Sequence, residues 1–496
     1  MTDSATSRKL DAAWLRKGAL AQLLGVLTGD GEDARVVGGA VRNHLLGEPI
    51  HEIDVATTAV PDEVVRRVTA AGFKTVPTGI EHGTVTVVID GHAFEVTTLR
   101  QDVETFGRRG KVAFGRDWRA DAERRDFTIN ALSAGPDGTV YDYVGGLADL
   151  AARRVRFIGE PRARIEEDYL RILRFFRFHA AYGYGEPDRD GLHACILGRA
   201  GLDRLSRERV RMELMKLLIA PRANPTLVVM TETGLLLQVL GGVPYLAGFE
   251  MMAKVESAIG IAPDAVQRLG ALAVLIAEDA ERLSQRLRLT NAEHGRLTVM
   301  GAQWRAFAPE HGEQAARALL YALKPESYLD CALLAWARSQ ASAHDAPWRA
   351  LAELPRRWTA PAFPLKAADF IARGIEKGPA LGAALRAAEQ DWVAAGFLGE
   401  KQKLEGLAGE IAAMYRTTRY FEEQVLRKRP YIERKWCRDA VLTPVRRKVQ
   451  SDGRIRYWAR VLVKTGTVRF LRVVTLQDGK TIHNAFFDRN FREEQK

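Results

Sequence analysis

Two short motifs near the N-terminus combine residue types suited to phosphate and metal chemistry. The first is Gly38-Gly39-Ala-Val-Arg42, in which a Gly-Gly step lets backbone N–H groups approach a phosphate and Arg42 adds a guanidinium. The second is Glu52-Ile-Asp54. On a strand, carboxylates at i and i+2 point to one face, a spacing that can hold divalent cations about 3.5–4 Å apart for phosphoryl transfer. Glu52 and Asp54 are therefore candidate metal ligands.

Two further features support this site. Glu95 lies in a neighbouring expected strand and is a candidate third carboxylate or a support for the other two. The segment 121–131 (DAERRDFTINA) carries a charge cluster into apolar residues, which pins it against the core instead of leaving it as a solvated surface. Its arginines could reach phosphates, and Asp121 or Asp126 could accept a hydrogen bond from a ribose hydroxyl. The candidate nucleotide-binding residues of this segment are Asp121, Arg124, Arg125 and Asn130.

A third segment, 167–178 (EDYLRILRFFRF), places Asp168, Arg171, Arg174 and Arg177 at intervals of three residues. Such a row is typical of a salt-bridged helix surface. Apolar residues fill nearly every other position, however, so we expect the helix to be buried, and buried charges need partners. A nucleotide supplies them, with a base edge for Asp168 and Arg171 and phosphates for Arg174 and Arg177.

The pattern of apolar residues predicts the elements that position these motifs. Alternation and turn residues predict an N-terminal sheet domain, with a hairpin at Asp90-Gly91. From about residue 160 the period becomes helical, beginning with one helix over 162–181. The expected head strands are 34–37, 52–56, 84–89 and 93–99, with a helix over 61–71, and the later helices are 202–218, 263–278, 280–287 and 379–394.

Charge divides the chain unevenly. Residues 414–496 hold 21 Lys and Arg against 9 Asp and Glu, which accounts for the whole excess behind the net charge of +11 over 496 residues. Within 414–496 we expect a helix followed by strands over 454–463, 468–476 and 480–487. The predicted domains are 1–150, a head domain built on a sheet, 151–260, a helical neck and body, 261–413, a helical tail, and 414–496, a basic α+β domain of unknown role.

Composition excludes several classes of protein. No apolar stretch approaches the roughly 18 residues of a membrane span, and the N-terminus lacks the apolar core of a signal peptide. Three widely spaced cysteines offer neither a disulfide framework nor a zinc site. We therefore expect a cytoplasmic protein without a membrane partner, whose oligomeric state the sequence leaves open.

The motifs, taken in order, resemble those of class II tRNA nucleotidyltransferases, the CCA-adding enzymes. The segments that carry the resemblance are GGAVRNHLLG…EID, GIEHGTVTVV, FEVTTLR, DAERRDFTINAL, YDYVGGLADL and EEDYLRILRFFRF, within residues 34–185, and the match continues more loosely over 186–413. The resemblance implies an α+β fold: a polymerase-β-like head with a mixed sheet and helices, an all-α neck, body and tail, and here a small extra C-terminal α+β domain.

The resemblance also implies an activity and roles for residues. Its members add C, C and A to tRNA 3′ ends from CTP and ATP, with Mg²⁺ and without a nucleic-acid template. Gly38, Gly39 and Arg42 would bind the incoming nucleotide, and the metal pair falls on Glu52 and Asp54. Within the later segments, Arg125 would contact the nucleotide, and Asp168 with Arg171 would hydrogen-bond the edge of its base. Arg174 and Arg177 would bind phosphate. Residues 101–120 would form a mobile loop.

Two departures leave alternatives open. Glu52 stands where the family has Asp, which keeps the charge but adds a methylene, and Asn43 replaces an acid after Arg42. Glu52 suggests an inactive tRNA-binding paralogue as one alternative. The others, a poly(A) polymerase and an enzyme that adds only CC or only A, stay open because the motifs barely separate them from CCA addition. The 414–496 segment faintly resembles RelE-type ribonuclease toxins, with His483, Asp488 and Arg489 as conceivable functional groups and Tyr457, Trp458 and Phe470 as aromatics within a basic surface.

Overall fold

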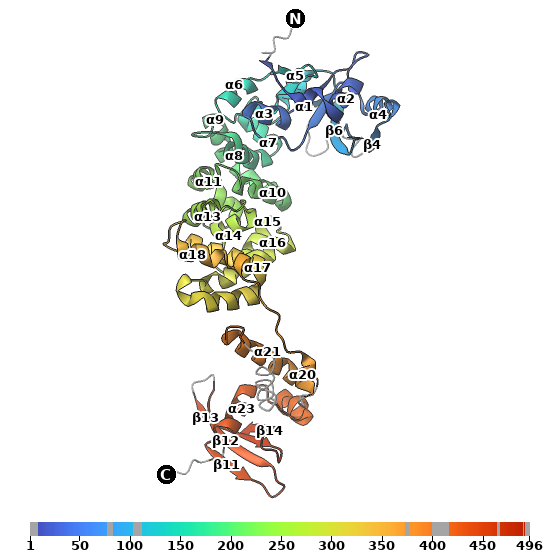
Figure 1. The fold of residues 1–496 in the computed structure, drawn as a ribbon. Coiled ribbons are helices and arrows are strands. Elements are labelled where there is room, and N and C mark those ends of the chain that lie inside the picture. The colour runs from blue at the N-terminus through green and yellow to red at the C-terminus, as the bar shows by residue number, and fades with distance from the viewer. Residues whose placement is uncertain are drawn as a thin grey trace. The chain divides into compact units, whose positions relative to one another are not determined.

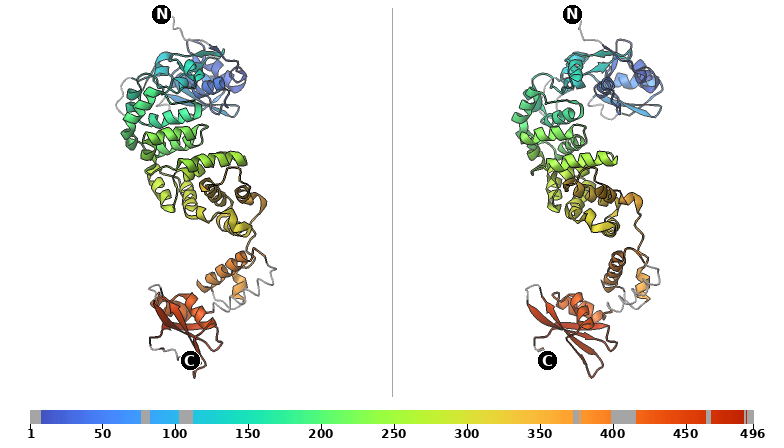
Figure 2. Two further views of the ribbon diagram at one scale, coloured as in Figure 1. Left: turned by 90° about the vertical axis from the view of Figure 1, so that its left-hand side faces the viewer. Right: turned by 60° about the vertical axis from the view of Figure 1, so that its left-hand side comes forward.

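The computed structural model describes residues 8–76, 83–102, 112–372, 377, 379–398, 416–463, 467–489 and 491. The chain divides into two compact units, shown in Figures 1 and 2. The first comprises Met1–Ala308 with Leu329–Arg349, and the second comprises Pro309–Tyr328 with Ala350–Lys496. The predicted boundary at 413/414 lies outside the described residues, so the four-domain division remains a prediction.

The N-terminal part of the first unit is built on a mixed sheet of eight strands in the order β1-β10-β9-β2-β3-β6-β5-β4. The β2–β3 pair is antiparallel and the β3–β6 pair is parallel. The strands are β1 Arg8–Lys9, β2 Ala34–Val37, β3 Asp54–Thr57, β4 Lys74–Val76, β5 Thr84–Ile89, β6 His92–Thr98, β9 Ser133–Ala134 and β10 Thr139–Tyr141, and β7 Arg100–Asp102 pairs separately with β8 Val112–Phe114. The α+β head predicted from the sequence is confirmed.

Turn chemistry explains why the head elements begin and end where they do. Asp90 and Gly91 both have positive φ, as a two-residue hairpin turn requires, and they join β5 to β6. Helix α3, Gly39–Leu46, ends at Gly47 in the left-handed conformation. Helix α4, Pro61–Ala70, has proline in its first turn. The other helices of the head are α1 Ala13–Arg16, α2 Gly18–Leu27, α5 Trp118–Glu123 and α6 Gly146–Ala151.

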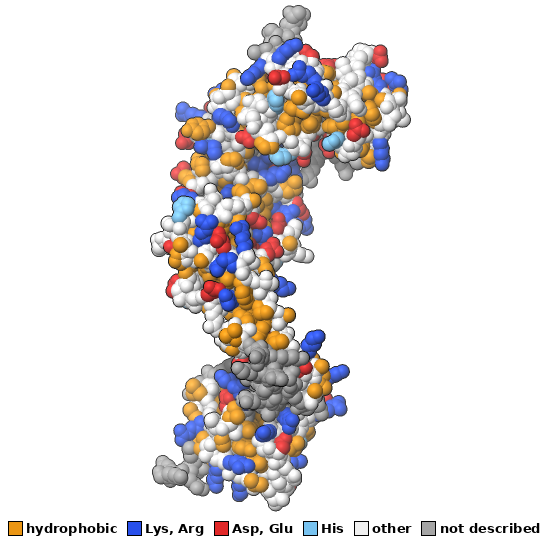
Figure 3. All heavy atoms as spheres, in the orientation of Figure 1, with side chains coloured by type: hydrophobic (Ala, Val, Ile, Leu, Met, Phe, Trp, Pro, Cys, Tyr) orange, Lys and Arg blue, Asp and Glu red, His pale blue; other side chains and the backbone are white. Residues whose placement is uncertain are grey.

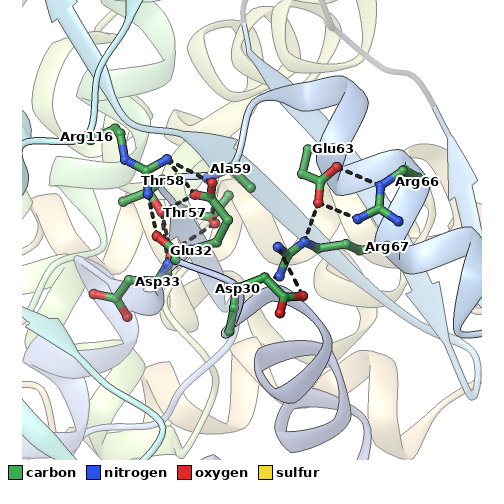
Figure 4. Close-up of polar contacts among 12 residues, drawn as sticks. Asp30, Glu32, Asp33, Thr57, Thr58, Ala59, Glu63, Arg66, Arg67 and Arg116 are labelled. Carbon is green, nitrogen blue, oxygen red and sulfur yellow. Dashed lines mark hydrogen bonds and ion pairs between the residues drawn. The ribbon is translucent and has the colours of Figure 1, made fainter.

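A polar network holds the far end of β3, the strand that begins at Asp54 (Figure 4). Glu32 accepts hydrogen bonds from the Thr58 hydroxyl and from Arg116, 2.8 Å away, and the Thr57 hydroxyl donates to the Asp33 carbonyl at 2.9 Å. Burial opposes ionisation of Glu32, but these donors prevail and lower its pKa. The strand end is therefore tied to the loop that precedes β2.

Two buried aspartates organise the YDYVGGLADL segment. The Asp142 carboxylate accepts hydrogen bonds from four backbone N–H groups, those of residues 144–147. Asp149, which is fully buried, accepts from the Thr128 hydroxyl at 2.7 Å and pairs with Arg154 and Arg156. This segment therefore anchors residues 126–130, which belong to the candidate site.

The rest of the first unit is helical, and the described residues between 160 and 398 contain no strand, as expected. The single helix predicted over 162–181 is wrong: α7 Pro161–Glu167 and α8 Leu170–Tyr182 are separated at Asp168, whose φ of −153° is extended. The helices that follow in this unit are α9 Arg189–Gly198, α10 Arg207–Leu218, α11 Ala223–Glu232, α12 Leu235–Leu240, α13 Leu246–Ile259, α14 Ala265–Ala273, α15 Ala277–Leu287 and α16 Asn291–Gln303, and α18 Ala346–Ala352 crosses from this unit into the second. The predicted helices over 202–218 and 263–278 were drawn too long.

Helix α17, Gly312–Arg338, contributes to both units and is interrupted at Lys324, which precedes Pro325. The second unit also contains α19 Leu354–Arg357, α20 Ala367–Ile371 and α21 Pro379–Ala394. Phe370 of α20 and Trp392 of α21 belong to one aromatic core. Within the described residues no helix is long and apolar enough to cross a membrane.

The C-terminal part of the second unit has its own core beneath a four-stranded antiparallel sheet, β11-β12-β13-β14. The predicted single helix is instead a π-helix and an α-helix separated around Pro430, and the strands number four, not three. The elements are η6 Phe421–Leu426, α23 Arg434–Leu442, β11 Arg446–Val449, β12 Ile455–Leu462, β13 Val468–Thr475 and β14 Ile482–Phe487. Strand β11 (RRKV) was not predicted, because all four of its residues are exposed and the segment lacks the alternation of apolar and polar residues that marks a strand with one buried face.

The buried Asp149 gives the first testable prediction. Replacing Asp149 by Ala leaves the Thr128 hydroxyl and two guanidinium groups without their acceptor, so we expect the free energy of unfolding to fall by about 2–3 kcal/mol, less than for a fully buried pair because both arginines are half exposed. Urea denaturation measures this. The exposed Glu123→Ala is the matched control and should stay within about 0.5 kcal/mol of the unmodified protein. Equal losses in the two variants would contradict the prediction.

Candidate active site

The turn between β2 and α3 requires glycine and lies against an arginine. Gly38 has φ +70°, and a Cβ at this position would lie 3.3 Å from Arg125 Nη1. The Gly38 N–H donates to the Leu132 carbonyl at 2.9 Å, so the turn is fixed to the segment that follows Asn130. The structure thereby brings the Gly-Gly motif and the 121–131 segment together, as the candidate site requires.

The carboxylates gather at the start of β3. Asp54 is the first residue of this strand and is the register partner of Val37 on β2 and of Glu95 on the parallel strand β6. Glu52 lies two residues before the strand begins, so the expectation that it occupies the strand is wrong. The alternation argument for a shared face therefore does not apply to Glu52.

The three acids nevertheless act on one another. Asp54 is exposed on one side, but desolvation by the surrounding protein, followed by the charges of Glu95 and Glu52, raises its pKa. Arg125 acts in the opposite direction and lowers it. Among the described residues no group of three or more His, Cys, Asp or Glu is arranged to hold a metal ion. The site therefore concentrates negative charge at Asp54 with one guanidinium nearby.

Arg42 is a buried cross-link at the base of the site. Its guanidinium donates hydrogen bonds to the Asn130 side chain, to Asn43 Oδ1 at 2.9 Å and to the Tyr182 hydroxyl at 2.7 Å, and it lies 3.9 Å from the Tyr182 ring centre. Burial lowers the pKa of Arg42, and the Tyr182 hydroxyl partly compensates. Arg42 thus joins α3 to the 121–131 segment and to α8, and Asn43, which replaces the acid of the family, serves as one of its acceptors.

Within the 121–131 segment the charged residues pair locally. The buried Asp121 accepts from Arg124 Nε at 2.8 Å and from Arg125 Nη2 at 3.2 Å. Asp126 accepts from Asn130 Nδ2 at 3.0 Å and forms an ion pair with Arg174 at 2.6 Å. Burial alone would raise the pKa of Asp126, but Arg174 and the hydrogen bonds from Asn130 prevail and lower it.

The groups expected to read a base lie at the α7–α8 junction. Asp168 receives a hydrogen bond from Arg209 Nη2 at 2.6 Å, and it also accepts from the Leu170 N–H at the start of α8. Arg171 donates to Glu167 at 2.5 Å and to the Arg164 carbonyl at 2.7 Å. Both groups are therefore engaged within the protein, on separate elements and with separate partners.

The later arginines of α8 share one acid on α10. The buried Glu213 pairs with Arg177 at 2.5 Å and with Arg174 at 3.7 Å. The Arg177 guanidinium also lies 4.2 Å from the ring centre of Phe178. These pairs supply within the protein the partners that buried charges need, and the nucleotide partners expected for the row stay a prediction.

The structure thus connects most of the candidate residues through direct contacts. Gly38 lies against Arg125, whose charge acts on Asp54, and the Asp126–Arg174 ion pair leads from the same segment to α8. Glu95 is joined to Asp54 by strand register. Sequence reasoning missed Tyr182, Arg209 and Glu213, which hold Arg42, Asp168 and Arg177. Their signal was weak, because each is an ordinary helical residue far along the chain from its partner. Of the expected mobile loop, residues 103–111 lie outside the described residues.

Known proteins share this architecture. The model of the poly A polymerase head domain matches residues 34–156, and that of the probable RNA and SrmB-binding site of polymerase A matches 199–249. The mitochondrial CCA tRNA nucleotidyltransferase 1 of Mus musculus is 33% identical over 385 residues, covering 76% of this chain and 86% of the mouse protein. The chain belongs to the CCA tRNA nucleotidyltransferase family. In the Limosilactobacillus fermentum CCA-adding enzyme, a member at 32% identity, the match covers 94% of the bacterial protein and 77% of this chain.

A solved structure extends the likeness within the CCA tRNA nucleotidyltransferase family. The crystal structure of the Bacillus stearothermophilus CCA-adding enzyme in complex with CTP is 29% identical, with a TM-score of 0.61, and the match covers 79% of this chain and 96% of the other. The Thermotoga maritima enzyme complexed with tRNA shares the fold at 18% identity, with a TM-score of 0.55. The predicted family, fold class and enzymatic class are confirmed, and about a fifth of the chain lies outside these matches.

The raised pKa of Asp54 gives a prediction for this nucleotidyltransferase. The pKa of Asp54 is higher in the folded state than its ordinary value of 3.8. Ionisation of Asp54 therefore lowers the free energy of unfolding at a pH above the folded-state pKa, and has no effect on it at a pH below 3.8. Asp54→Asn should therefore raise the Tm at pH 7, and the gain should disappear as the pH falls toward 4. Calorimetry at several pH values tests this. A Tm difference independent of pH would contradict it.

The Arg42 cross-link gives a second prediction. Arg42→Lys keeps the charge, but a single ammonium cannot bond Asn130, Asn43 and Tyr182 in the planar arrangement that the guanidinium provides. We expect kcat/KM for nucleotide addition to fall about tenfold or more, because the helix that follows the Gly-Gly turn loses its anchor. Tyr182→Phe removes one hydrogen bond and keeps the ring, and should cost less. A lysine variant as active as the unmodified enzyme would refute this role.

Proposed function

We propose that this chain adds C, C and A to tRNA 3′ ends from CTP and ATP, with release of pyrophosphate. The observation that carries the proposal is the concentration of carboxylate charge at Asp54, beside the Gly38 turn and Arg125, in a chain of the CCA tRNA nucleotidyltransferase family. The Bacillus stearothermophilus relative was solved with CTP, and the Thermotoga maritima relative with tRNA.

Asp54 and Glu52 would hold Mg²⁺, with Glu95 as a third carboxylate or a support. Carboxylate oxygens are the donors that Mg²⁺ prefers, and a cation would relieve the repulsion that Glu95 and Glu52 exert on Asp54. Bound as a pair of ions, Mg²⁺ would lower the pKa of the primer 3′-hydroxyl and stabilise charge on the leaving pyrophosphate. CCA-adding nucleotidyltransferases depend on metal in general; that the metal is Mg²⁺ is part of the proposal.

The other residues bind and orient. The backbone N–H groups of the Gly38-Gly39 turn and the guanidiniums of Arg124 and Arg125 would receive triphosphate. Asp168 and Arg171 would hydrogen-bond the Watson–Crick edge of cytosine or adenine, exchanging their present partners Arg209 and Glu167 for the base. A wrong base would leave buried donors and acceptors unpaired, which is how side chains can discriminate between bases.

In the same proposal, the phosphates of the bound nucleotide and primer are held from α8. Arg174 and Arg177 would form ion pairs with these phosphates, while Asp126 and Glu213 keep the two guanidiniums in position. Asp121 would accept from a ribose hydroxyl. Asn130 and Arg42 would fix the segment and the helix that carry these groups.

A poly(A) polymerase remains the second candidate, because the model matching residues 34–156 describes the head domain of that enzyme. An inactive tRNA-binding paralogue is the third, because Glu52 replaces the usual aspartate. The cytoplasmic location predicted from the sequence also remains a proposal, and the mouse and human relatives are named as mitochondrial.

Purified protein, a tRNA lacking its 3′ terminus, Mg²⁺, and CTP and ATP separately and together test the function. We expect stepwise addition that stops at CCA. Runs of A from ATP alone would indicate a poly(A) polymerase, and no incorporation would indicate the paralogue.

Two variants at position 52 examine the departure from the family. Glu52→Asp shortens the ligand and should retain activity within about tenfold, whereas Glu52→Gln removes a charge and should lower kcat about 10²-fold or more. Thermal melts with and without Mg²⁺ supply an independent readout, since Mg²⁺ should raise the Tm of the unmodified protein more than that of Glu52→Gln. Full activity of Glu52→Gln would remove this residue from the metal site.

A further inference from the structure

The sheet β11–β14 has one face buried by helices and one that is not. Helices η6 and α23 pack on the face formed by Ala459, Val461, Leu471 and Val473, together with Ala485. Tyr457 shares this face and donates from its hydroxyl to the Gly479 carbonyl, so it does not belong to the basic surface predicted for it. Direct register pairing places the alternate residues on the opposite face, which we call the open face: Arg446, Lys448, Arg456, Trp458, Arg460, Leu462, Val468, Phe470, Arg472, Val474, Asn484 and Phe486. Arg446, Lys448 and Arg460 are exposed, whereas Trp458 and Val474 are buried.

Cationic and aromatic side chains alternate across the open face. One row of register partners runs Arg446, Trp458, Arg472, Phe486 from β11 to β14. The Arg472 guanidinium lies 3.9 Å from the Phe486 ring centre, and Trp458 and Phe470 lie 5.3 and 5.0 Å from the ring of Phe491. Figure 3 shows Lys and Arg side chains distributed over this part of the chain.

The open face places like charges directly opposite each other. Lys448 on β11 is the register partner of Arg456 on β12, an arrangement that destabilises an antiparallel pair. Desolvation lowers the pKa of Arg472 and the charge of Arg456 lowers it further, although Asp488 opposes both. The fold therefore tolerates a repulsion that a polyanion would neutralise.

Among the described residues, the acids of this region lie away from the open face, with the exception of Asp488. Glu422, Glu423, Glu433 and Asp439 belong to or border the helices, and Asp452 and Asp478 lie in turns. The exception, Asp488, pairs with Arg472 at 3.3 Å and accepts from Trp458. His483 contacts Thr418 and Tyr420 instead, so the described contacts do not join His483 to Asp488.

We propose that the open face binds RNA, through phosphate contacts from its cations and stacking of bases on its aromatic residues. Phosphates are the anions that a row of guanidinium and ammonium groups recognises without regard to sequence. The partly exposed rings of Phe470 and Phe486 offer surface on which unpaired bases stack. The choice of RNA over other polyanions rests on the proposed function, which makes tRNA the substrate of the same chain. The open face then supplies a second tRNA contact, outside the head.

The test compares two full-length double variants of equal net charge. Lys448→Glu with Arg460→Glu reverses two exposed cations on the open face, and Lys428→Glu with Lys435→Glu reverses two exposed cations of the helical side. The probe is a fluorescent 20-residue oligouridylate, titrated by anisotropy at several salt concentrations. We expect the open-face variant to lose about tenfold or more in affinity and its salt slope to fall by about two, whereas the control stays within about twofold.

Single substitution of Lys448 separates binding from folding. Lys448→Glu places opposite charges across β11 and β12, so its Tm should equal or exceed that of the unmodified protein while oligouridylate binding weakens. Equal losses in both double variants, no loss in either, or binding of the unmodified protein to phosphatidylserine vesicles but not to RNA would overturn the proposal. Nucleotide incorporation is measured separately, so failure of the proposed function is distinguishable from failure of this one.

Discussion

The carboxylate of Asp126 is the contact on which the candidate site depends. It receives the Asn130 amide on one side and the Arg174 guanidinium on the other, and so connects the sheet domain to α8. Asn130 in turn holds Arg42, and Arg42 holds α3, whose N-terminus follows the Gly38 turn. A carboxylate that stays ionised can bind both donors at once, and the lowered pKa of Asp126 keeps it ionised. One chain of charge-assisted hydrogen bonds thus joins the elements that carry the candidate site.

Functional charge in this protein is arranged against stability in two places. At Asp54 neighbouring acids repel one another, and at Lys448 and Arg456 neighbouring bases do so. Elsewhere in the described residues, buried charges such as Asp149, Glu213 and Glu256 have opposite partners within hydrogen-bond distance. Like charges that face one another are costly unless a ligand of opposite sign is bound. The sign of each cluster agrees with the ligand proposed for it, cations for the acids and phosphates for the bases.

Local chemistry made part of this structure predictable. The Asp90-Gly91 turn, the helix that ends at Gly47 and strand β2 follow from residue types that admit few conformations. The break at Asp168 was not predictable from period alone, because the apolar pattern continues through it. The extended residue is held by its contacts with Arg209 and with the Leu170 N–H. Likewise, nothing local distinguishes Glu213 from other helical acids until α10 packs against α8. Family motifs located the site, and packing supplied its supporting residues.

The separation of α7 from α8 has a consequence for how one site accepts both a pyrimidine and a purine. Asp168 belongs to the extended junction, whereas Arg171 belongs to the helix. Rotation about the backbone of the junction would move the aspartate relative to a fixed arginine and change the width of the slot between them. A pyrimidine and a purine could then each fit between Asp168 and the same Arg171 on α8. Under the proposed function, selectivity between bases would then depend on the backbone of the short junction between α7 and α8.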